Sequence, residues 1–427
     1  MTSIRRPRHL RSEEILDAQS QWTGLDAKRL DNIADHLERN YLAPRKIAGC
    51  QLAITRRGHP AYFRSFGLMD RERGRPMADD TIFRIFSMTK PIASIALMQL
   101  FEKGHFQLSD PVSRFIPSWR DHRVWVSGHG PSMVTEPPVR PVSMRDVLAH
   151  TGGLTYGGAL SAIGAADEQD PVDAIYAEAG ITRDGGDTLA EFAHKLGHVP
   201  LRYQPGERWM YSYSTDVCGA LVEIISGRPL DRYIAEAITG PLGMVDTAFH
   251  VAPEKAARLA ANYRRAADKS LQLADDPATS DYLKPPKFLS GGAGLTGTAA
   301  DYMRFCEALR RGGELDGARI IGPRTLELMR MNHLKDGLDL AGLAVSRFAD
   351  GPLEGAGFGL GFAMTLDHIP AGSISAGEYY WGGAASTLFW VDPREDLCVV
   401  FMTQCMPMGV FNFRGQLKNL IYSAIVD

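Results

Sequence analysis

The first hundred residues carry three hydrophobic patterns, each typical of a different element. The polar segment from Leu25 to Asn40 predicts an amino-terminal helix. Two β-rich runs, Ile47 to Thr55 and Pro60 to Phe66, flank a turn that contains Gly58, which predicts a hairpin. From Pro91 to Gly104 apolar residues recur at helical spacing with few polar interruptions. This segment is therefore predicted to be a helix that is buried on most sides and ended by its final glycine.

The pattern changes after about residue 110. Up to about residue 287, helical patterns are separated by long connections rich in glycine, proline and aspartate, such as Ser118 to Pro141 and Ile163 to Asp187. This predicts a mostly helical region inserted into the first one. Because long loops in compact domains often carry function, we expect these two connections to border the pocket.

Strand patterns return near the carboxyl end. Three β-rich runs with turn-rich or charged linkers predict an antiparallel meander: Gly357 to Thr365, Tyr379 to Val391 and Leu397 to Thr403. A final helix is predicted from Phe413 to Val426, because its apolar residues fall on one face that can lie on the sheet. The first and last segments of the chain are therefore expected to share one sheet.

Together these patterns predict an α/β (α+β) protein in which helices flank an antiparallel sheet and a second domain is mostly helical. The sheet domain is expected to combine residues 1–110 and 288–427, and the helical domain to span residues 111–287, with the active site in the cleft between them. A length of 427 residues suits this division, since one domain typically holds about 100 to 200 residues.

Composition narrows the range of partners. Hydrophobic residues make up 44% of the chain and charged residues 23%, as in ordinary globular domains. The 47 Lys and Arg residues nearly balance the 50 Asp and Glu residues, for a formal net charge of -3. Such a balance gives no long-range field that would recruit nucleic acid or an anionic membrane, so we expect a small-molecule partner.

Cysteine usage and the amino terminus bear on the compartment. Five widely spaced cysteines, with no Cys-x-x-Cys pair, are expected to be buried free thiols in a reducing environment: Cys50, Cys218, Cys306, Cys398 and Cys405. The first residues carry arginines without the apolar run of a signal peptide, and no stretch is long and apolar enough for a membrane span. We therefore expect a cytoplasmic protein.

Candidate chemistry begins where a strand-like run meets the buried helix. Ser87-Met-Thr-Lys90 is the only Ser-x-x-Lys in the chain, and its spacing places the hydroxyl and the amine on one helical face. A serine at a helix amino terminus lies where developing negative charge is favoured, and a lysine kept neutral by burial can take its proton. Pro91 fits the first turn of such a helix. The alternative is an N-cap serine beside a solvated lysine.

Two further segments offer partners for this pair. Tyr211 follows a Pro-Gly turn and precedes an apolar helix. Since the ordinary pKa of tyrosine is about 10, Tyr211 can act as a base only if a close ammonium such as Lys90 stabilises the phenolate; otherwise it is a core aromatic. In Tyr379-Tyr-Trp-Gly-Gly-Ala-Ala-Ser386, paired glycines interrupt a strand. They indicate either close backbone approach to a ligand or a bulge.

Other motifs lack the flanking elements or residues that their usual function requires. Gly292-Ala-Gly-Leu-Thr-Gly297 has the spacing of a dinucleotide fingerprint, but the segment before it contains Lys-Pro-Pro-Lys and is no strand. His194 and His198 share a helical face without the glutamate of a zinc protease, so metal binding is not expected. His150 is interpreted as a structural residue at the end of a short helix. The chain has no Gly-x-Ser-x-Gly nucleophile elbow.

Three strings together carry a family resemblance. Ser87-Met-Thr-Lys90, Tyr211-Ser-Tyr213 and Trp381-Gly-Gly383 resemble, in order and spacing, the motifs of serine β-lactamase-like hydrolases. That superfamily includes class C β-lactamases and penicillin-binding proteins, and the pattern is most similar to the family VIII carboxylesterases. The resemblance spans about residue 47 to the end, with further matches in Leu148 to Leu154, Gly292 to Gly297, Asp301, and Gly357 to Phe362.

The resemblance implies a nucleophile, a base and an oxyanion hole, with no cofactor and no metal. By position, Ser87 is acylated, and Lys90 and Tyr211 share the role of general base. The backbone N–H groups of Ser87 and Ala384 form the oxyanion hole. Residues expected around the substrate are Trp381, Gly382, Gly383, Tyr213, Tyr156 and Phe358.

Two positions depart from the pattern of β-lactamases. Trp381 stands where these enzymes usually carry the lysine of Lys-Thr-Gly. The site thereby loses a cation for a substrate carboxylate and gains an aromatic wall that suits a neutral acyl ester. Tyr213 replaces the usual asparagine of the second motif, which removes an amide for a lactam side chain. Both changes favour esters over lactams.

The sequence therefore predicts a cytoplasmic serine carboxylesterase that hydrolyses short-chain acyl esters through a covalent acyl-enzyme. On the same scaffold, a β-lactamase or D-amino peptide hydrolase and an acyltransferase remain open. A non-catalytic binding scaffold is the alternative from a different class, although such a module has no need for Ser87, Lys90 and Tyr211 together.

Overall fold

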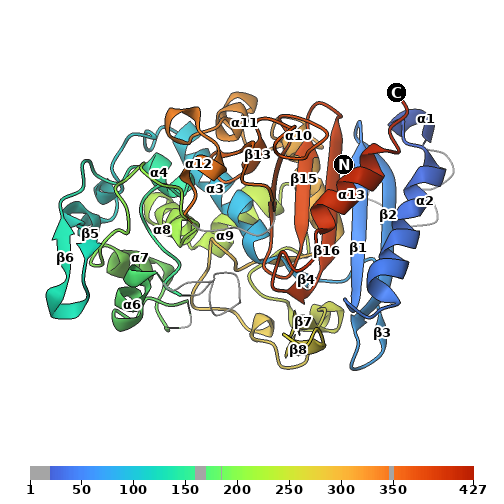
Figure 1. The fold of residues 1–427 in the computed structure, drawn as a ribbon, viewed down its shortest axis with the longest axis horizontal. Coiled ribbons are helices and arrows are strands. Elements are labelled where there is room, and N and C mark those ends of the chain that lie inside the picture. The colour runs from blue at the N-terminus through green and yellow to red at the C-terminus, as the bar shows by residue number, and fades with distance from the viewer. Residues whose placement is uncertain (1–19, 159–169, 184, 346–350) are drawn as a thin grey trace, which may run out of the picture.

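The computed structural model describes residues 20–158, 170–183, 185–345 and 351–427, and its largest feature is an eight-stranded antiparallel sheet (Figure 1). The strand order is β12-β13-β14-β15-β16-β1-β2-β3. Within this sheet β1 pairs with β16, so the first and last segments share one sheet as predicted. The strands are β1 (Gly49–Arg56), β2 (His59–Asp70), β3 (Arg75–Pro76), β12 (Ala356–Phe358), β13 (Ala363–Thr365), β14 (Tyr379–Gly382), β15 (Leu388–Asp392) and β16 (Leu397–Thr403).

Helices cover the sheet and explain why its central strands are buried. The helix α10 (Ala299–Arg310) contacts β1, β15 and β16. The helix α13 (Phe413–Tyr422) crosses in front of the strands in Figure 1 and contacts α2 (Ala27–Leu37), which follows the short α1 (Ser20–Thr23). All eight residues of β1 are buried. The fold class is therefore the predicted one, with one sheet packed between helices.

The predicted buried helix lies at the centre of the molecule as α3 (Thr89–Glu102). All its residues from Thr89 to Leu100 are buried, and it contacts α8 (Ser214–Ser226) and α9 (Leu230–Ile234). Pro91 lies in its first turn, and Gly104 follows its end with a left-handed φ of 78°. The other helices are α4 (Met144–Leu148), α6 (Pro171–Glu178), α7 (Leu189–Leu196), α11 (Pro323–Arg330) and α12 (Leu340–Leu343).

Short strand pairs occur where the pattern predicted helices and loops. The connection Ser118 to Pro141 contains the hairpin of β5 and β6, and β7 and β8 lie beside β17 in a separate three-stranded sheet. Each of these strands is too short to show a clear alternation, which is why the sequence pattern missed them. The division of the chain at residues 110 and 287 remains a prediction. The bounds are β4 (Phe83–Arg84), β5 (Val124–Ser127), β6 (Val134–Glu136), β7 (Asn262–Arg265), β8 (Leu271–Asp275), β9 (Thr296–Gly297), β10 (Glu314–Leu315), β11 (Ala318–Arg319) and β17 (Cys405–Met406).

Two of the predicted carboxyl-terminal runs are each a hairpin. The run Gly357 to Thr365 folds back at Gly361, whose φ is 98°, so that β12 pairs with β13. The run Tyr379 to Val391 folds back near Ser386, whose φ is 64°, so that β14 pairs with β15. Both reversals use a left-handed backbone conformation, which a strand pattern does not encode.

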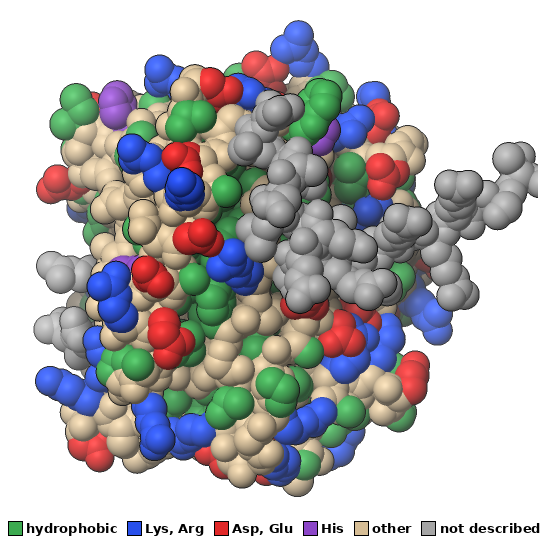
Figure 2. All heavy atoms as spheres, turned by 90° about the vertical axis from the view of Figure 1, so that its right-hand side faces the viewer, with side chains coloured by type: hydrophobic (Ala, Val, Ile, Leu, Met, Phe, Trp, Pro, Cys, Tyr) green, Lys and Arg blue, Asp and Glu red, His purple; other side chains and the backbone are tan. Residues whose placement is uncertain are grey.

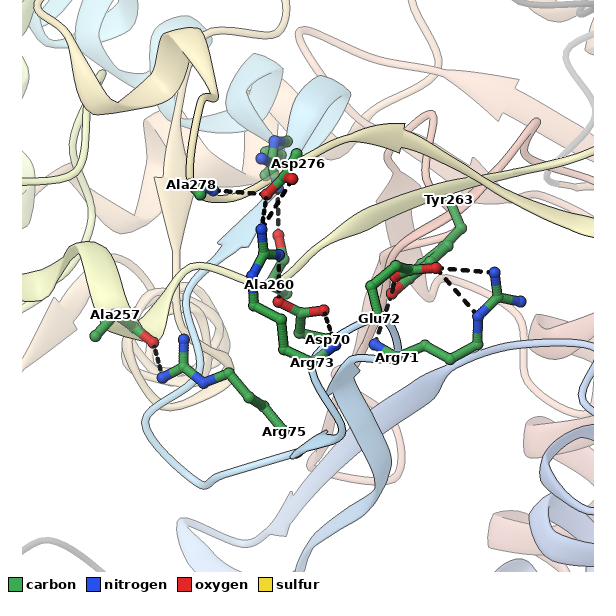
Figure 3. A network of polar contacts seen from close by, with 11 residues as sticks. Asp70, Arg71, Glu72, Arg73, Arg75, Ala257, Ala260, Tyr263, Asp276 and Ala278 are labelled. Atoms are coloured by element: carbon green, nitrogen blue, oxygen red, sulfur yellow. Dashed lines mark hydrogen bonds and ion pairs between the residues drawn. The ribbon is translucent and has the colours of Figure 1, made fainter.

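Polar contacts join the β2–β3 end of the sheet to the smaller sheet (Figure 3). Arg73 contacts Asp70 at 2.8 Å and Asp276 at 2.9 Å, and Tyr263 donates a hydrogen bond to Glu72. Asp70 and Asp276 share the Arg73 guanidinium, and Glu72 pairs with Arg71, so we interpret the cluster as a structural contact. On the face shown in Figure 2, cationic and anionic side chains are likewise interspersed.

Two sequence expectations about the interior can be compared with the structure. All five cysteines are free and buried, as predicted, whereas the reducing compartment remains a prediction. Among the helices of the described ranges, none combines the length and the apolar character needed to cross a bilayer.

Candidate active site

Ser87 lies in a tight connection between a short strand and the central helix. After β4, the segment Phe86–Met88 forms one 3-10 turn that continues directly into α3. Phe86 has a φ of 43°, a left-handed conformation that costs free energy in a non-glycine residue. The hydrogen bond from Ile85 N to Leu295 O, at 3.1 Å, holds this connection in place. The sharp turn thus fixes the serine at the start of a buried helix.

Gly383 explains how the end of β14 reaches this connection. A Cβ atom at Gly383 would lie only 2.4 Å from the carbonyl oxygen of Ile85. Only glycine therefore permits this contact. The predicted close backbone approach is present, but it is made to the segment before Ser87. Ala384, the next residue, is half-buried.

Lys90 is buried beside the serine, with a fractional exposure of 1%. Its Nζ lies 3.1 Å from Ser87 Oγ, 2.8 Å from the Tyr156 hydroxyl and 2.7 Å from the carbonyl oxygen of Gly292. The solvated lysine that the sequence left open as an alternative is therefore excluded.

The surroundings of Lys90 disfavour its charged form. Burial holds the pKa of Lys90 well below its ordinary value, the Arg183 guanidinium lowers that pKa further, and Asp216 opposes both effects. Within the described ranges, no ion pair links Lys90 to a carboxylate. A neutral amine next to a hydroxyl can accept its proton, as a general base must.

Tyr211 completes a three-residue cluster with Ser87 and Lys90, called the SKY cluster below. Its hydroxyl donates to Ser87 Oγ at 2.7 Å, and Lys90 Nζ lies 4.5 Å from the centre of its ring. Burial raises the pKa of Tyr211, although hydrogen bonds with Ser87 and Trp381 act against this rise. In the resting site Tyr211 is therefore a neutral donor.

Other predicted pocket residues pack around this cluster. The Trp381 ring lies 5.5 Å from that of Tyr211 and 5.3 Å from that of Phe358. Tyr213 packs on Tyr156 with ring centres 4.8 Å apart. Gly382 is the last residue of β14 and pairs with Leu388. The rings of Tyr156 and Trp381 thus pack against the SKY cluster.

A hollow with an apolar lining borders Trp381. Of the residues predicted to contact substrate, only Trp381 lines it. The lining has little polar surface, which suits the hydrocarbon part of a ligand. The lining residues are Trp209, Leu340, Gly351, Pro352, Leu353, Ala363, Tyr380 and Trp381.

His150 bonds to hydroxyl groups through both ring nitrogens, and the structure shows no bond from it to Ser87 within the described ranges. Its two ring nitrogens lie 3.2 Å from the hydroxyl oxygens of Ser212 and Thr215. Burial, and secondarily the charge of Lys90, hold the pKa of His150 well below its ordinary value. Both nitrogens are thus engaged away from Ser87.

Sequence reasoning missed three residues next to Lys90. Arg183 and Asp216 form an ion pair at 3.1 Å, and Gly292 supplies the carbonyl that Lys90 contacts. Gly292 belongs to a string noted for its resemblance to the family, and that string offered the one available signal. Arg183 lies on a loop, where no spacing rule links it to Ser87.

Comparisons with known proteins agree with this geometry. The profile of the Beta-lactamase family matches residues 34–421. Protein Rv1367c of Mycobacterium tuberculosis is 33% identical over 84% of this chain and 86% of its own length. Esterase EstB of Burkholderia gladioli is 32% identical over 90% of this chain and 92% of its own.

A solved structure shares the whole fold. It is that of EstCE1, described as a hydrolase with promiscuous acyltransferase activity. It superposes with a TM-score of 0.74 at 26% identity, covering 94% of this chain and 98% of EstCE1. The resemblance that the three sequence motifs carried is thereby confirmed. With a family match over most of its length and full-length relatives, this chain belongs to the Beta-lactamase family.

Proposed function

We propose that this protein is a serine carboxylesterase that cleaves short-chain acyl esters through an acyl-enzyme on Ser87. The observation that carries the proposal is the buried Lys90, which lies 3.1 Å from Ser87 Oγ and whose hydrogen-bond partners among the described residues are neutral oxygens. The similarity to Esterase EstB supports the same class of reaction.

The proposed chemistry needs no group beyond the chain and water. Lys90 accepts the proton of Ser87 as Oγ bonds to the ester carbonyl carbon. Tyr211 shares this role by holding Ser87 and passing a proton to the departing alkoxide, so that an alcohol leaves. Water then attacks the acyl-enzyme, gives its proton to the same pair and releases the acid with Ser87 restored.

The oxyanion is assigned to two backbone N–H groups. Those of Ser87 and Ala384 follow from the resemblance, and the close approach of Gly383 to Ile85 supports the placement of Ala384 next to Ser87. Both tetrahedral intermediates carry their negative charge at this position. The N–H groups stabilise it without a cation.

The aromatic wall favours a neutral ester over a β-lactam. Trp381 occupies the position of the usual lysine and borders an apolar hollow. A substrate carboxylate would lose its water there without gaining a cation, which is costly. An acyl chain, in contrast, gains from burial against aromatic rings.

The test compares wild type with Ser87→Ala on p-nitrophenyl butyrate, with folding checked by circular dichroism. We expect the folded variant to lose essentially all turnover, because the proposed acyl-enzyme forms on the Ser87 hydroxyl. Retained activity would contradict the proposal. Turnover of a cephalosporin at a comparable rate would overturn the preference for esters.

Acyl transfer is a second candidate function, because the similar EstCE1 is described as having promiscuous acyltransferase activity. Chemically, an alcohol takes the place of water in the second step. Adding a primary alcohol to the assay should then yield a new ester at the expense of free acid. If the product ratio stays unchanged, the protein acts as a hydrolase only.

A further inference from the structure

Tyr156 lies inside the hydrogen-bond network of the SKY cluster. Its fractional exposure is 5%, and its hydroxyl lies 2.8 Å from Lys90 Nζ and 3.3 Å from a terminal nitrogen of Arg183. It is also hydrogen-bonded to Tyr211, with ring centres 5.1 Å apart. Tyr156 therefore contacts two of the three residues in that cluster.

The donors and acceptors of this network fix the direction of each bond. Arg183 has only donors, so the Tyr156 oxygen accepts from it. Tyr211 donates to Ser87, so its oxygen accepts the hydroxyl proton of Tyr156. Tyr156 then has no proton left for Lys90, and its oxygen accepts from the amine.

This arrangement leaves one position of Lys90 free. A neutral amine has two N–H donors and one lone pair. One N–H goes to the Gly292 carbonyl, which can only accept, and the other goes to Tyr156. The lone pair therefore faces Ser87 Oγ, which is the orientation a general base requires.

The Arg183–Asp216 ion pair holds the two oxygens to which Lys90 donates, those of Tyr156 and Gly292. One oxygen of Asp216 lies 3.1 Å from Arg183, and the other accepts from the N–H of Gly292 at 3.0 Å. A Cβ at Gly292 would lie 2.7 Å from Asp216 Oδ2 and 2.9 Å from the Arg183 nitrogen, so only glycine fits against the pair. Ser290 also donates to Asp216, at 2.5 Å, and braces this loop.

We propose that Tyr156 is a positioning residue for Lys90, and that the Arg183–Asp216 ion pair holds the Tyr156 hydroxyl and the Gly292 carbonyl so that the lysine lone pair faces Ser87. The inference rests on the proposed function and deepens it. It differs from the substrate contact that the family resemblance implies for Tyr156. The two roles make opposite kinetic predictions.

The first test is Tyr156→Phe, which removes the hydroxyl and keeps the ring. We expect kcat on p-nitrophenyl butyrate to fall by roughly 10- to 100-fold, as for other small losses of orientation, with KM unchanged. The rate constant for labelling of Ser87 by a fluorophosphonate should fall in parallel. A raised KM with kcat unchanged would show substrate contact and overturn the proposal, as would wild-type values for both.

The second test separates positioning from general stability. Lys90 is faced by Ser87, Tyr156 and Tyr211, by the charged Arg183 and Asp216, and by His150. Removing the cation in Arg183→Met should raise the pKa of Lys90 and move the acid limb of kcat/KM to higher pH. Arg183→Lys should restore much of the shift. If kcat/KM falls at the same acidic pH in wild type and both variants, the proposed role of the ion pair is contradicted.

Tyr176→Phe is the matched control. It also removes one buried tyrosine hydroxyl. This hydroxyl accepts a hydrogen bond from the backbone N–H of Thr155 at 3.4 Å. We expect its kcat, KM and labelling rate to equal those of wild type.

Fluorophosphonate labelling keeps the two levels of the account distinguishable, since it requires no particular ester. If wild type is not labelled at Ser87, the proposed function fails and the positioning role fails with it. If wild type is labelled but Tyr156→Phe reacts at the same rate, only the positioning role fails.

Discussion

Two buried lysines in this protein have opposite surroundings. Lys418, on α13, forms an ion pair with the fully buried Glu378 and lies 3.3 Å from Ser373 Oγ. Lys90, on α3, contacts the neutral oxygens of Ser87, Tyr156 and Gly292. The fractional exposures, 7% and 1%, are both low. The difference between the two sites therefore lies in their partners.

Those partners decide what each lysine can do. Burial lowers the pKa of both amines, but for Lys418 the carboxylate of Glu378 counteracts that effect. For Lys90 the opposing carboxylate, Asp216, is already paired with Arg183. Lys418 is thus paired with a carboxylate and ties α13 to Glu378, whereas the surroundings of Lys90 favour the neutral amine that the proposed general base requires. Burial alone does not make a lysine catalytic.

The largest expected effect is on activity. Lys90→Met removes the amine and keeps a similar shape, so kcat/KM should fall by at least about 100-fold, the usual loss for a general base. Lys418→Met, the matched substitution at the structural site, should leave kcat/KM unchanged. Esterase assays at saturating and limiting substrate check both. Equal losses in the two variants would mean that the lysines do not differ in role.

For the free energy of unfolding, Lys418→Met should have the larger effect of the two lysine substitutions. Lys418→Met leaves Glu378 buried without its cation, so the free energy of unfolding should fall by about 3 to 5 kcal/mol. Urea unfolding followed by circular dichroism measures this change. If the free energy of unfolding stays at its wild-type value, the ion pair does not anchor α13.

The double variant Lys418→Met with Glu378→Leu sharpens the same comparison. The double variant no longer leaves the Glu378 carboxylate buried without a cation. Its free energy of unfolding should therefore be higher than that of Lys418→Met alone. The recovery should be incomplete, because Thr365 and Ser373 donate hydrogen bonds to Glu378. Additive losses would contradict a coupled pair.

A smaller effect concerns the pH dependence of stability. Burial in the folded state lowers the pKa of Lys90, while the unfolded chain keeps it protonated up to its ordinary pKa of about 10.4. Between the lowered pKa of the folded state and about pH 10.4, the unfolded state therefore binds more protons at Lys90. Across that range Lys90 should raise the free energy of unfolding of wild type with pH, by at most about 1.4 kcal/mol per pH unit. Lys90→Met should lack that contribution. If the free energy of unfolding changes with pH in the same way in both proteins between neutral pH and pH 10, the lowered pKa of Lys90 is contradicted.

Features set by local sequence were predictable. The spacing of Ser87 and Lys90, the apolar run of α3 and the hairpin of β1 and β2 depend on neighbouring residues, and each is present in the structure. The proximity of Tyr211 was implied by the family resemblance, and its hydroxyl lies 2.7 Å from Ser87 Oγ. The catalytic roles of these residues remain predictions.

Features set by distant contacts were not predictable. Arg183 reaches Asp216 and Tyr156 from a loop, and no periodicity connects these positions. The hairpin turns at Gly361 and Ser386 depend on a left-handed backbone, so two runs that read as single strands are four strands. Tertiary packing, which the hydrophobic pattern does not specify, fixes both.

The most direct test of the account is the pH dependence of acylation. Stopped-flow mixing of the enzyme with p-nitrophenyl butyrate gives the rate constant of the first p-nitrophenol release, with Lys418→Met as the control. A neutral Lys90 predicts that this rate constant reaches its plateau well below the ordinary lysine pKa of about 10.4, in wild type and in the control alike. A rate constant that keeps rising until the pH nears that value would show that Lys90 is charged in the resting enzyme and would contradict the account.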